Sequence, residues 1–386
     1  MFLIALKMLF NDKAKFFGIV MGVTLASLVI AQQGSIFTGL MSRTFGAITD
    51  ISYPHIWVMD PKVQFIDDAK PLADTRLFEV RSVEGVAWAV PLYKGMIRAR
   101  LQNGQFQNCN LYGIDDTTLI GGPSRMVEGR LEDLRRADSV IVDFDGATSR
   151  LAKPPTRPGE PPTPLQVGDT LELNDRRAVV VGIHRGTRTF QSQPNIFTTY
   201  SRAVSFAPRE RKLLTFVLVG AAEGQDLQEL CDRIATQTGL AAYTSDQFKM
   251  LTVSYFLRNT GIPINFGIAV ALGFLVGTLI TGFMFYSFTL DNLRYLGTLK
   301  AMGVGDTQLM LMILLQAVVV GAIGFGIGVG GAALFGNSMR GTQLAFRMTW
   351  QLLVIAGGAT TIICMLAAML SVRKVIALEP AVVFKG

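Results

Sequence analysis

FFGIVMGVTLASLVIAQQGSIFTGLMS, residues 16–42, contains no Asp, Glu, Lys or Arg. Three further stretches, residues 259–290, 307–339 and 348–372, also lack charged side chains. A helix needs about 20 apolar residues to cross a hydrocarbon core about 30 Å thick. Each of the four stretches exceeds that length, so the sequence predicts four transmembrane helices.

The charged residues are concentrated outside these stretches. Over the 386 residues only 17% are charged and 50% are hydrophobic. Outside the four stretches the charged fraction rises to about 24%, close to the ~25% of ordinary soluble domains. This distribution predicts a hydrophilic domain joined to a membrane protein, and it excludes a soluble enzyme, a fibrous chain and a disordered chain.

The positions of the charges that add up to the net +7 predict how the chain is oriented in the membrane. Between residues 43 and 258 basic and acidic residues nearly balance, so a nucleic-acid-binding surface is not expected there. Lys and Arg accumulate on the cytoplasmic side of membrane proteins. We therefore place both termini and the 291–306 loop in the cytoplasm, and residues 43–258 outside. The basic residues that argue for this are Lys7, Lys13, Lys15, Arg294, Lys300, Arg373, Lys374 and Lys385, against only Arg340 and Arg347 in the remaining short loop.

The predicted fold is a four-helix membrane protein with a large extracytoplasmic α+β domain inserted between helices 1 and 2. Residues 1–15 predict a cytoplasmic amphipathic helix, with an extension of the first membrane helix as the alternative. Glycines recur in the third membrane stretch and predict close helix contacts. The expected segments are 1–15, the first membrane helix 16–42, the external domain 43–258 with an inserted subdomain at about 114–212, the second membrane helix 259–290, the cytoplasmic loop 291–306, the third membrane helix 307–339, the external loop 340–347, the fourth membrane helix 348–372 and the cytoplasmic tail 373–386.

Turn dipeptides and β-type composition organise the external domain. Asn103-Gly104 and Asn174-Asp175 each predict a hairpin turn. Residues 153–165, KPPTRPGEPPTPL, are too rich in proline for a helix or a central strand and predict an exposed loop. Strands are expected at 56–59, 86–90, 96–101, 105–112, 139–142, within 170–183 and at 216–219, and helices at 75–83, 226–238 and 245–258, the last continuing into the second membrane helix.

Catalytic and metal-binding patterns are absent from the sequence. There is no GxxxxGK[ST] phosphate loop, no GxSxG and no HExxH, so neither ATP hydrolysis nor another enzyme activity is expected, and no cofactor is expected to bind. The membrane stretches contain no ionisable residue of the kind that ion-coupled transporters use. Cys109 and Cys231 could form a disulfide or stay unpaired, and both alternatives stay open because the sequence does not give their distance. Cys364 lies in the fourth membrane stretch and is expected to pack there.

The cytoplasmic loop contains the most specific motif. Leu293, Leu296, Leu299 and Met302 recur every three residues and predict an apolar face on a short helix. Gly303 predicts its end, and Asp306 is expected to cap the next helix. The alternative is a plain helical hairpin between two membrane helices.

Residues 294–303, RYLGTLKAMG, followed by a Gly-rich stretch, resemble the RE-IG-LKALG signature of the MacB/FtsX-type ABC permeases. Nearly the whole chain has that family's order of a basic N-terminal helix, an anchor, an external domain and three clustered helices. Residues 127–130, 140–142, 168–169 and 180–183 resemble the family's external domain, and the ending EPAVVFKG, 379–386, looks closest to the DevC-like exporter branch. One position departs from the signature, because Tyr295 stands where the family commonly has Glu.

The resemblance implies a non-catalytic permease subunit of a bacterial ABC exporter in the cytoplasmic (inner) membrane. It implies a homodimer with two copies of a separate ATPase that binds ATP and Mg, a membrane-fusion adaptor and an outer-membrane channel, and an exported hydrophobic compound, lipid or peptide. The alternative is an FtsX-like regulator that activates a cell-wall hydrolase and transports nothing. The residues expected to couple to the ATPase are Leu293, Arg294, Tyr295, Leu296, Gly297, Leu299, Lys300, Ala301, Met302 and Gly303.

Overall fold

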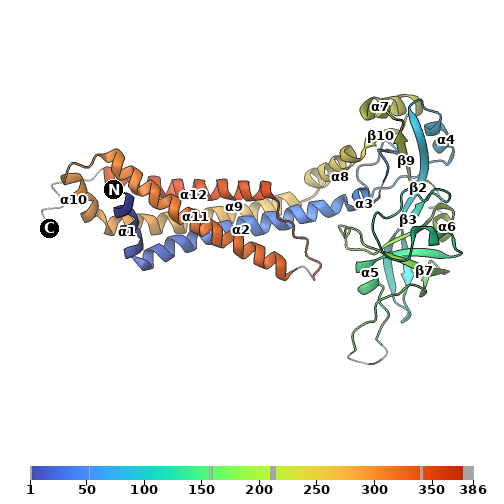
Figure 1. Ribbon diagram of the computed structural model, residues 1–386, viewed down its shortest axis with the longest axis horizontal. Coiled ribbons are helices and arrows are strands. Elements are labelled where there is room, and N and C mark those ends of the chain that lie inside the picture. Colours follow the sequence, from blue (N-terminus) through green and yellow to red (C-terminus); the bar gives the residue numbers. More distant parts are fainter. Residues whose placement is uncertain are drawn as a thin grey trace. The chain divides into compact units, whose positions relative to one another are not determined.

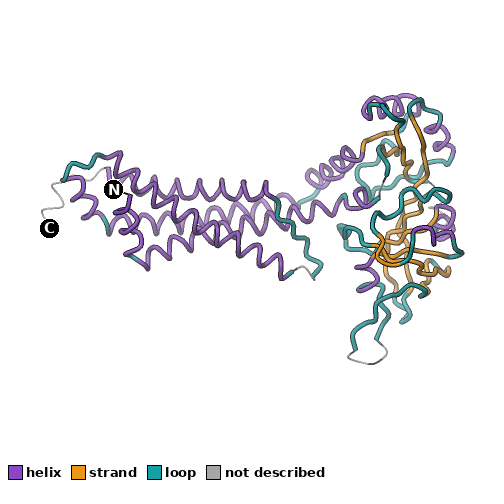
Figure 2. Tube along the Cα trace, viewed as in Figure 1, coloured by secondary structure: helices purple, strands orange, loops and turns teal. Residues whose placement is uncertain are grey.

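The computed structural model describes residues 2–51, 53–155, 157, 160–208, 214–339 and 342–376. The chain forms two compact units (Figure 1), one of Met1–Leu40 with Gly261–Gly386 and one of Met41–Thr260. The first unit is helical, and all described strands belong to the second (Figure 2). The predicted fold class, four apolar helices with an α+β domain between the first and the second, is confirmed. Arg340 and the DevC-like ending lie outside the described residues.

Among the described residues, four helices are long and apolar enough to cross a membrane. They are α2 (Lys13–Thr44), α9 (Ile262–Asp291), α11 (Asp306–Ser338) and α12 (Trp350–Ile376). The N-terminal residues form a separate helix, α1 (Phe2–Asn11), and do not extend α2. The helices divide at Asp12, whose carboxylate accepts a hydrogen bond from the backbone N–H of Lys15 and thereby caps α2.

Small residues bring α2 and α11 into close contact, as the glycine pattern predicts. A Cβ added at Gly328 would lie 1.9 Å from Oγ of Ser27, and one at Gly324 would lie 2.7 Å from the side chain of Val23. The hydroxyl of Ser27 donates a hydrogen bond to the carbonyl of Gly324 at 3.1 Å. These helices therefore pack backbone against backbone, which only glycine at these positions permits.

The expected continuous helix from residue 245 into the second membrane helix is wrong. The structure ends α8 (Ser245–Asn259) and starts α9 at Ile262. Thr260 between them is extended, and its hydroxyl donates back to the carbonyl of Phe256. Pro263 lies in the first turn of α9, where its missing N–H removes no helical hydrogen bond, so it starts a helix here instead of kinking one.

The second unit contains a sheet of ten strands, ordered β10-β1-β9-β2-β3-β8-β5-β7-β4, with β6 paired to β2 and β7. Most neighbours are antiparallel, but β3 and β5 run parallel to β8 and β7 respectively. The strands are β1 (Ile56–Met59), β2 (Val86–Arg100), β3 (Phe106–Ile114), β4 (Met126–Glu128), β5 (Ser139–Asp143), β6 (Thr170–Leu173), β7 (Arg176–His184), β8 (Asn195–Thr199), β9 (Phe216–Ala221) and β10 (Ala241–Thr244).

Short helices join these strands. Asp226 caps α7 (Leu227–Thr238) by accepting hydrogen bonds from the N–H groups of Gln228 and Glu229, and Gly239 ends it with a positive φ of 68°. The other short helices of the unit are α3 (Gly46–Asp50), α4 (Thr75–Arg81), the 3₁₀ helix η1 (Leu131–Arg135), α5 (Phe144–Thr148) and α6 (Tyr200–Phe206).

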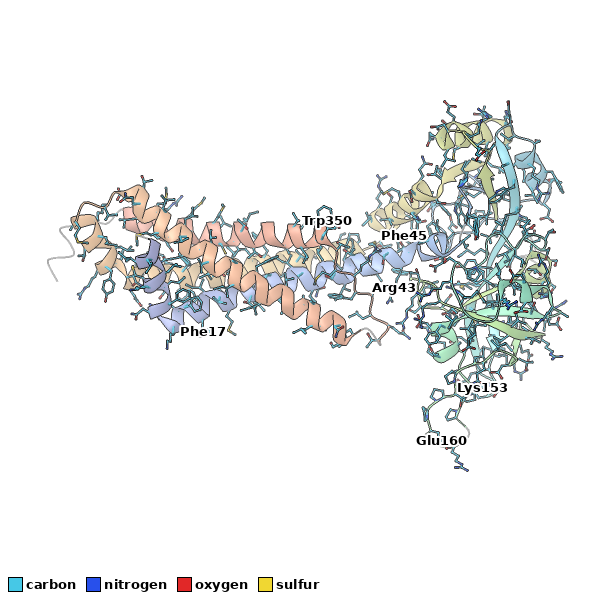
Figure 3. All side chains as sticks on the ribbon, in the orientation of Figure 1. Phe17, Arg43, Phe45, Lys153, Glu160 and Trp350 are labelled. Carbon is cyan, nitrogen blue, oxygen red and sulfur yellow. The ribbon has the colours of Figure 1, made fainter. Side chains whose placement is uncertain are left out.

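Both predicted hairpins are confirmed, and one strand is longer than expected. Gly104 turns β2 into β3 with a φ of 80°, and Asn174 and Asp175 turn β6 into β7 with φ values of 46° and 63°. Residues 86–90 and 96–100 belong to one strand, β2, because the residues between them stay in the ladder, and Leu101 lies beyond its end. The proline-rich segment is a loop closed at its base by a bridge between Lys153 and Thr163. In Figure 3, Lys153 lies near that base and Glu160 further out.

Cys109 and Cys231 are unpaired in the structure, as is Cys364. Cys109 lies in the core formed by β2, β3, β5 and β7, whereas Cys231 lies in the core between β9 and α7. The structure therefore favours the alternative of separate buried thiols over a disulfide.

Candidate ATPase-coupling site

The loop predicted to be cytoplasmic, residues 291–306, contains a short helix, α10 (Leu293–Ala301), directly after α9. The helix ends at Gly303, which has a φ of 93°. The N–H of Gly303 donates to the carbonyl of Lys300, and the N–H of Val304 donates to that of Leu299. This pair of hydrogen bonds is a Schellman motif, so the predicted helix end at Gly303 is confirmed.

The apolar side of α10 packs on its own bundle. Leu296 is only 4% exposed, Gly297 is buried, and Leu293 and Leu299 pack on the same cluster. The side chain of Leu296, which is predicted to couple to the ATPase, is therefore covered by its own bundle. The three-residue spacing correctly indicates an amphipathic helix, but it does not reveal which surface covers the apolar side.

A different side of α10 is accessible. The side chains of Tyr295 and Met302 are 66% and 69% exposed, although both are large and apolar in part. Residues separated by three, four, seven or eight positions share one face of a helix. The exposed face, which we call the α10 face, is formed by Arg294, Tyr295, Thr298, Ala301 and Met302 and continues to the exposed Gly303.

Lys300 is directed toward its own chain. Its ammonium group lies 2.8 Å from the carboxylate of Asp306 at the start of α11, and its side chain is only 19% exposed. The expected capping role of Asp306 is wrong, because Gly305 occupies the cap position and no side chain caps the helix. Asp306 instead connects the two helices through this ion pair and places a negative charge at the N-terminal end of α11, where the helix dipole favours it.

A groove of about 1020 Å³ lies beside the α10 face, between α1 and the junction of α9 and α10. Leu3, Phe10 and Tyr295 expose apolar surface along it. Figure 1 shows α1 and α10 at the same end of the helical bundle. The residues that line the groove are Leu3, Leu6, Lys7, Met8, Phe10, Asn11, Asp12, Lys13, Asp291, Asn292 and Tyr295.

The sequence did not reveal that α1 packs into the core of the helical bundle. Ala5 and Leu9, one helical turn apart, are fully buried in the bundle core. The side-chain amide of Gln316, buried in α11, donates a hydrogen bond of 2.8 Å to the carbonyl of Ala5. An isolated glutamine in an apolar membrane stretch was the available signal, because a buried amide needs a partner.

Two buried groups of the second unit have large pKa shifts. Burial lowers the pKa of His184 to about 4, and burial raises the pKa of Asp143 to about 6. Asp143 accepts hydrogen bonds from the N–H groups of Gly146 and Asn195, so it acts as a helix cap and strand connector. Among the described residues, no three His, Cys, Asp or Glu side chains gather as metal ligands would.

The fold defines a multi-pass membrane protein with an inserted α+β domain. A model of the FtsX-like permease C-terminal region matches residues 267–380, and a model of the MacB-like periplasmic core domain matches residues 16–237. The second match covers more than half of the chain, which therefore belongs to the MacB/FtsX-type ABC transporter permeases. Membership implies the inner membrane and a partner ATPase, and permease subunits of this family are generally non-catalytic.

Curated relatives have the same description. The chain is 27% identical over 322 residues to an uncharacterized ABC transporter permease of Mycobacterium bovis, covering 82% of this chain and 80% of that protein. It is 24% identical over 326 residues to another uncharacterized ABC transporter permease, from Mycobacterium tuberculosis, with the same coverage of 82% and 80%.

Two solved structures resemble the second unit at low identity. The periplasmic region of MacB from Actinobacillus actinomycetemcomitans is 16% identical, with a TM-score of 0.37 over 53% of this chain and 94% of that one. The extracellular domain of the ABC-type transporter YknZ from Gram-positive bacteria is 11% identical, with a TM-score of 0.34 over 50% and 99%. Similarity at this level says nothing about cargo or partners.

Proposed function

We propose that this chain is the permease subunit of a bacterial ABC exporter, acting as a homodimer with two copies of a separate ATPase. ATP binding and hydrolysis, with Mg, take place on the ATPase. The resulting motion enters through α10 and is transmitted by mechanical coupling to the extracytoplasmic domain. The covalent continuity of α2 from the bundle into the second unit supports such a path, since the helix runs unbroken from Lys13 to Thr44.

The observation that carries this proposal is the exposed α10 face. Tyr295 and Met302 leave large apolar surface accessible on a helix whose other side is buried. Aromatic and flexible apolar side chains are typical anchors of protein interfaces. The rigid support of the helix by Leu296 and by the Lys300–Asp306 ion pair suits a surface that must transmit force. In this reading Tyr295 supplies an aromatic anchor where the family commonly has an acidic one.

The test is co-purification of the ATPase with permease variants. Tyr295→Ala and Met302→Ser should each lower ATPase recovery and transport about tenfold, which corresponds to roughly 1.4 kcal/mol at an interface. Both variants should reach the membrane, because neither side chain supports the fold. Met250→Ser is the matched control, since Met250 is 67% exposed on α8 and lies outside the α10 face. Normal ATPase recovery and transport in both α10 variants would refute this coupling surface.

The cargo follows from the family only as a class. We propose a hydrophobic compound, lipid or peptide, delivered through a membrane-fusion adaptor to an outer-membrane channel. The regulator alternative makes a different prediction for the same variants. If the motion activates a cell-wall hydrolase, Tyr295→Ala should impair cell separation, and the unaltered chain should export no cargo.

A further inference from the structure

A cavity of about 570 Å³ lies in the second unit where β2 changes its partner. Residues Val86–Leu92 of β2 pair with β9, whereas Tyr93–Arg100 pair with β3. Figure 1 shows β2 running through both halves of the unit, with β9 beside one end and β3 beside the other. At such a division neighbouring strands diverge, and the space between them must be filled by side chains or left open.

Thr215 stabilises the division. Its hydroxyl accepts a hydrogen bond of 2.7 Å from the N–H of Lys94 and donates one of 2.8 Å to the carbonyl of Leu92. The hydroxyl thus satisfies backbone groups on β2 exactly where the ladder passes from one neighbour to the other. The cavity therefore lies beside a part of the sheet in which the backbone groups of Leu92 and Lys94 have hydrogen-bond partners.

Lys94 is the unusual residue of this cavity. Its side chain is only 5% exposed, yet it lines the cavity and forms an ion pair with Asp67. Its ammonium group also lies 5.8 Å from the ring centroid of Tyr112. Burial removes hydration from the ammonium group of Lys94 while the carboxylate of Asp67 stays partly exposed, so this ion pair contributes little stability compared with apolar packing. The stability of the fold alone therefore does not explain why a lysine occupies position 94.

The polar groups of the cavity are arranged in depth. Lys94 lies at the buried end, whereas the carboxylate of Asp67 belongs to a side chain that is 43% exposed. Asp68 also lines the cavity and is paired with Lys70 at 2.7 Å. The walls add amide groups from Asn110, Gln191 and Gln193. A cation is thus buried and carboxylates lie nearer to solvent, whereas the amide groups lie at different depths, with Asn110 buried and Gln191 exposed.

We propose that this cavity binds a short peptide with free termini, its carboxylate on Lys94 and its amino group on Asp67. A ligand with both charges can divide the Lys94–Asp67 ion pair and satisfy each partner, so neither charge is left unpaired in the cavity. A purely anionic ligand would pair only with Lys94, and a purely cationic ligand only with Asp67. Either would leave the other residue without a counter-charge. The amide side chains match the peptide bonds of such a ligand, and the volume lies within the ~300–1,000 Å³ of small-ligand sites.

This proposal goes beyond the exporter function and does not depend on it, because binding is measured on the permease without the ATPase. The full-length chain in lipid nanodiscs is titrated with an equimolar tripeptide mixture that has free termini. Three capped forms of the same mixture are compared, acetylated at the amino end, amidated at the carboxyl end, or both. Ligand-observed NMR and calorimetry should detect the uncapped mixture and show each capped form at least about tenfold weaker.

Two variants place the binding in this cavity. Lys94→Met should weaken the uncapped mixture at least about tenfold, and Asp67→Asn should abolish the preference for a free amino group. Lys249→Met is the control, because Lys249 pairs with Asp246 outside the cavity. If Lys94→Met fails to fold, Asp67→Asn and the comparison of capped with uncapped tripeptides still test the proposal. The proposal is overturned by no binding of the uncapped mixture at millimolar concentration, by equal binding of the capped forms, or by equal loss in Lys249→Met.

Discussion

The ammonium group of Lys300 and the carboxylate of Asp306 form an ion pair of 2.8 Å that joins the last turn of α10 to the first turn of α11. Lys300 therefore stabilises the corner on which the α10 face is built, and its charge is not simply offered to a partner. The sequence motif predicts a coupling role for this lysine but does not indicate that its counter-charge lies six positions later in the same chain.

We expect Lys300→Glu to destabilise this corner by about 1 kcal/mol and to reduce ATPase recovery, because it places two carboxylates together. The double variant Lys300→Glu with Asp306→Lys restores opposite charges and should recover most of both losses. Thermal unfolding of the purified permease and ATPase co-purification are the measurements. A double variant that regains stability but stays uncoupled would show instead that Lys300 contacts the ATPase directly.

Leu296 should behave as a core residue of the permease. Since it is 4% exposed, Leu296→Ala should destabilise the helical bundle by about 2–5 kcal/mol and lower its melting temperature. Thr298→Ala, on the exposed face of the same helix, is the control and should leave the melting temperature nearly unchanged. Melting of the detergent-purified variants tests this, and equal stability of Leu296→Ala and the unaltered chain would contradict the packing of α10.

The turns of the second unit were predictable from the sequence, whereas the side of α10 that is exposed was not. Asn103-Gly104 and Asn174-Asp175 specify their turns through local backbone preferences, so a short sequence window is enough. The long charge-free stretches specify membrane helices for a similarly local reason, their length and lack of charge.

The features that were mispredicted depend on tertiary contacts. Whether Leu296 faces a partner or its own bundle is decided by α11 and α1, which a helical period does not encode. The parallel pairing of β3 with β8 joins residues about 85 positions apart, as between Asn110 and Asn195, and no local pattern announces it. The break at Thr260 is local, because the polar residues 258–260 and Gly261 separate α8 from α9.

Burial of His184 should make the second unit sensitive to acid. The pKa of His184 is lowered to about 4 by burial, whereas in the unfolded chain it lies near 6.5. Between these values the unfolded chain binds more protons, so stability present above pH 6.5 is lost as the pH falls toward 4, by about 3 kcal/mol. Denaturant unfolding followed by tryptophan fluorescence should show this fall, and His184→Leu should remove it.

Exposed His55 provides the control for this experiment, and His55→Gln should keep the full acid-dependent fall. An unchanged pH profile in His184→Leu would contradict the assignment.

Asp143 should act in the opposite direction. Burial raises its pKa to about 6 from 3.8, so the folded chain binds the extra proton between these values. Its contribution to stability is therefore fully present below pH 3.8 and is lost as the pH rises through 6. Asp143→Asn cannot titrate and should make the acid-dependent fall caused by His184 steeper over this range. The same denaturant experiment measures it, and a shallower profile in Asp143→Asn would reverse the sign argued here.

The last prediction concerns the contact of α2 with α11. A Cβ at Gly328 would lie 1.9 Å from Oγ of Ser27 and 2.7 Å from the carbonyl oxygen of Thr24, and the latter is backbone that cannot rotate away. We expect Gly328→Ala to push the two helices apart, lower the melting temperature of the bundle and reduce transport. Such overpacking typically costs about 1–3 kcal/mol.

Gly330 on the same helix is the matched control, because a Cβ there would meet nothing within 4 Å. Alanine favours a helix over glycine by about 1 kcal/mol, so Gly330→Ala should fold as well as the unaltered chain or better. The two variants add the same methyl group two positions apart, and their difference in melting temperature isolates the contact with α2. Since the contact is made by backbone atoms on both sides, Ser27→Ala should rescue Gly328→Ala only in part. Full rescue would mean that the hydroxyl of Ser27 alone sets the distance between the helices, and equal melting of Gly328→Ala and Gly330→Ala would mean that α2 and α11 do not approach as closely as described.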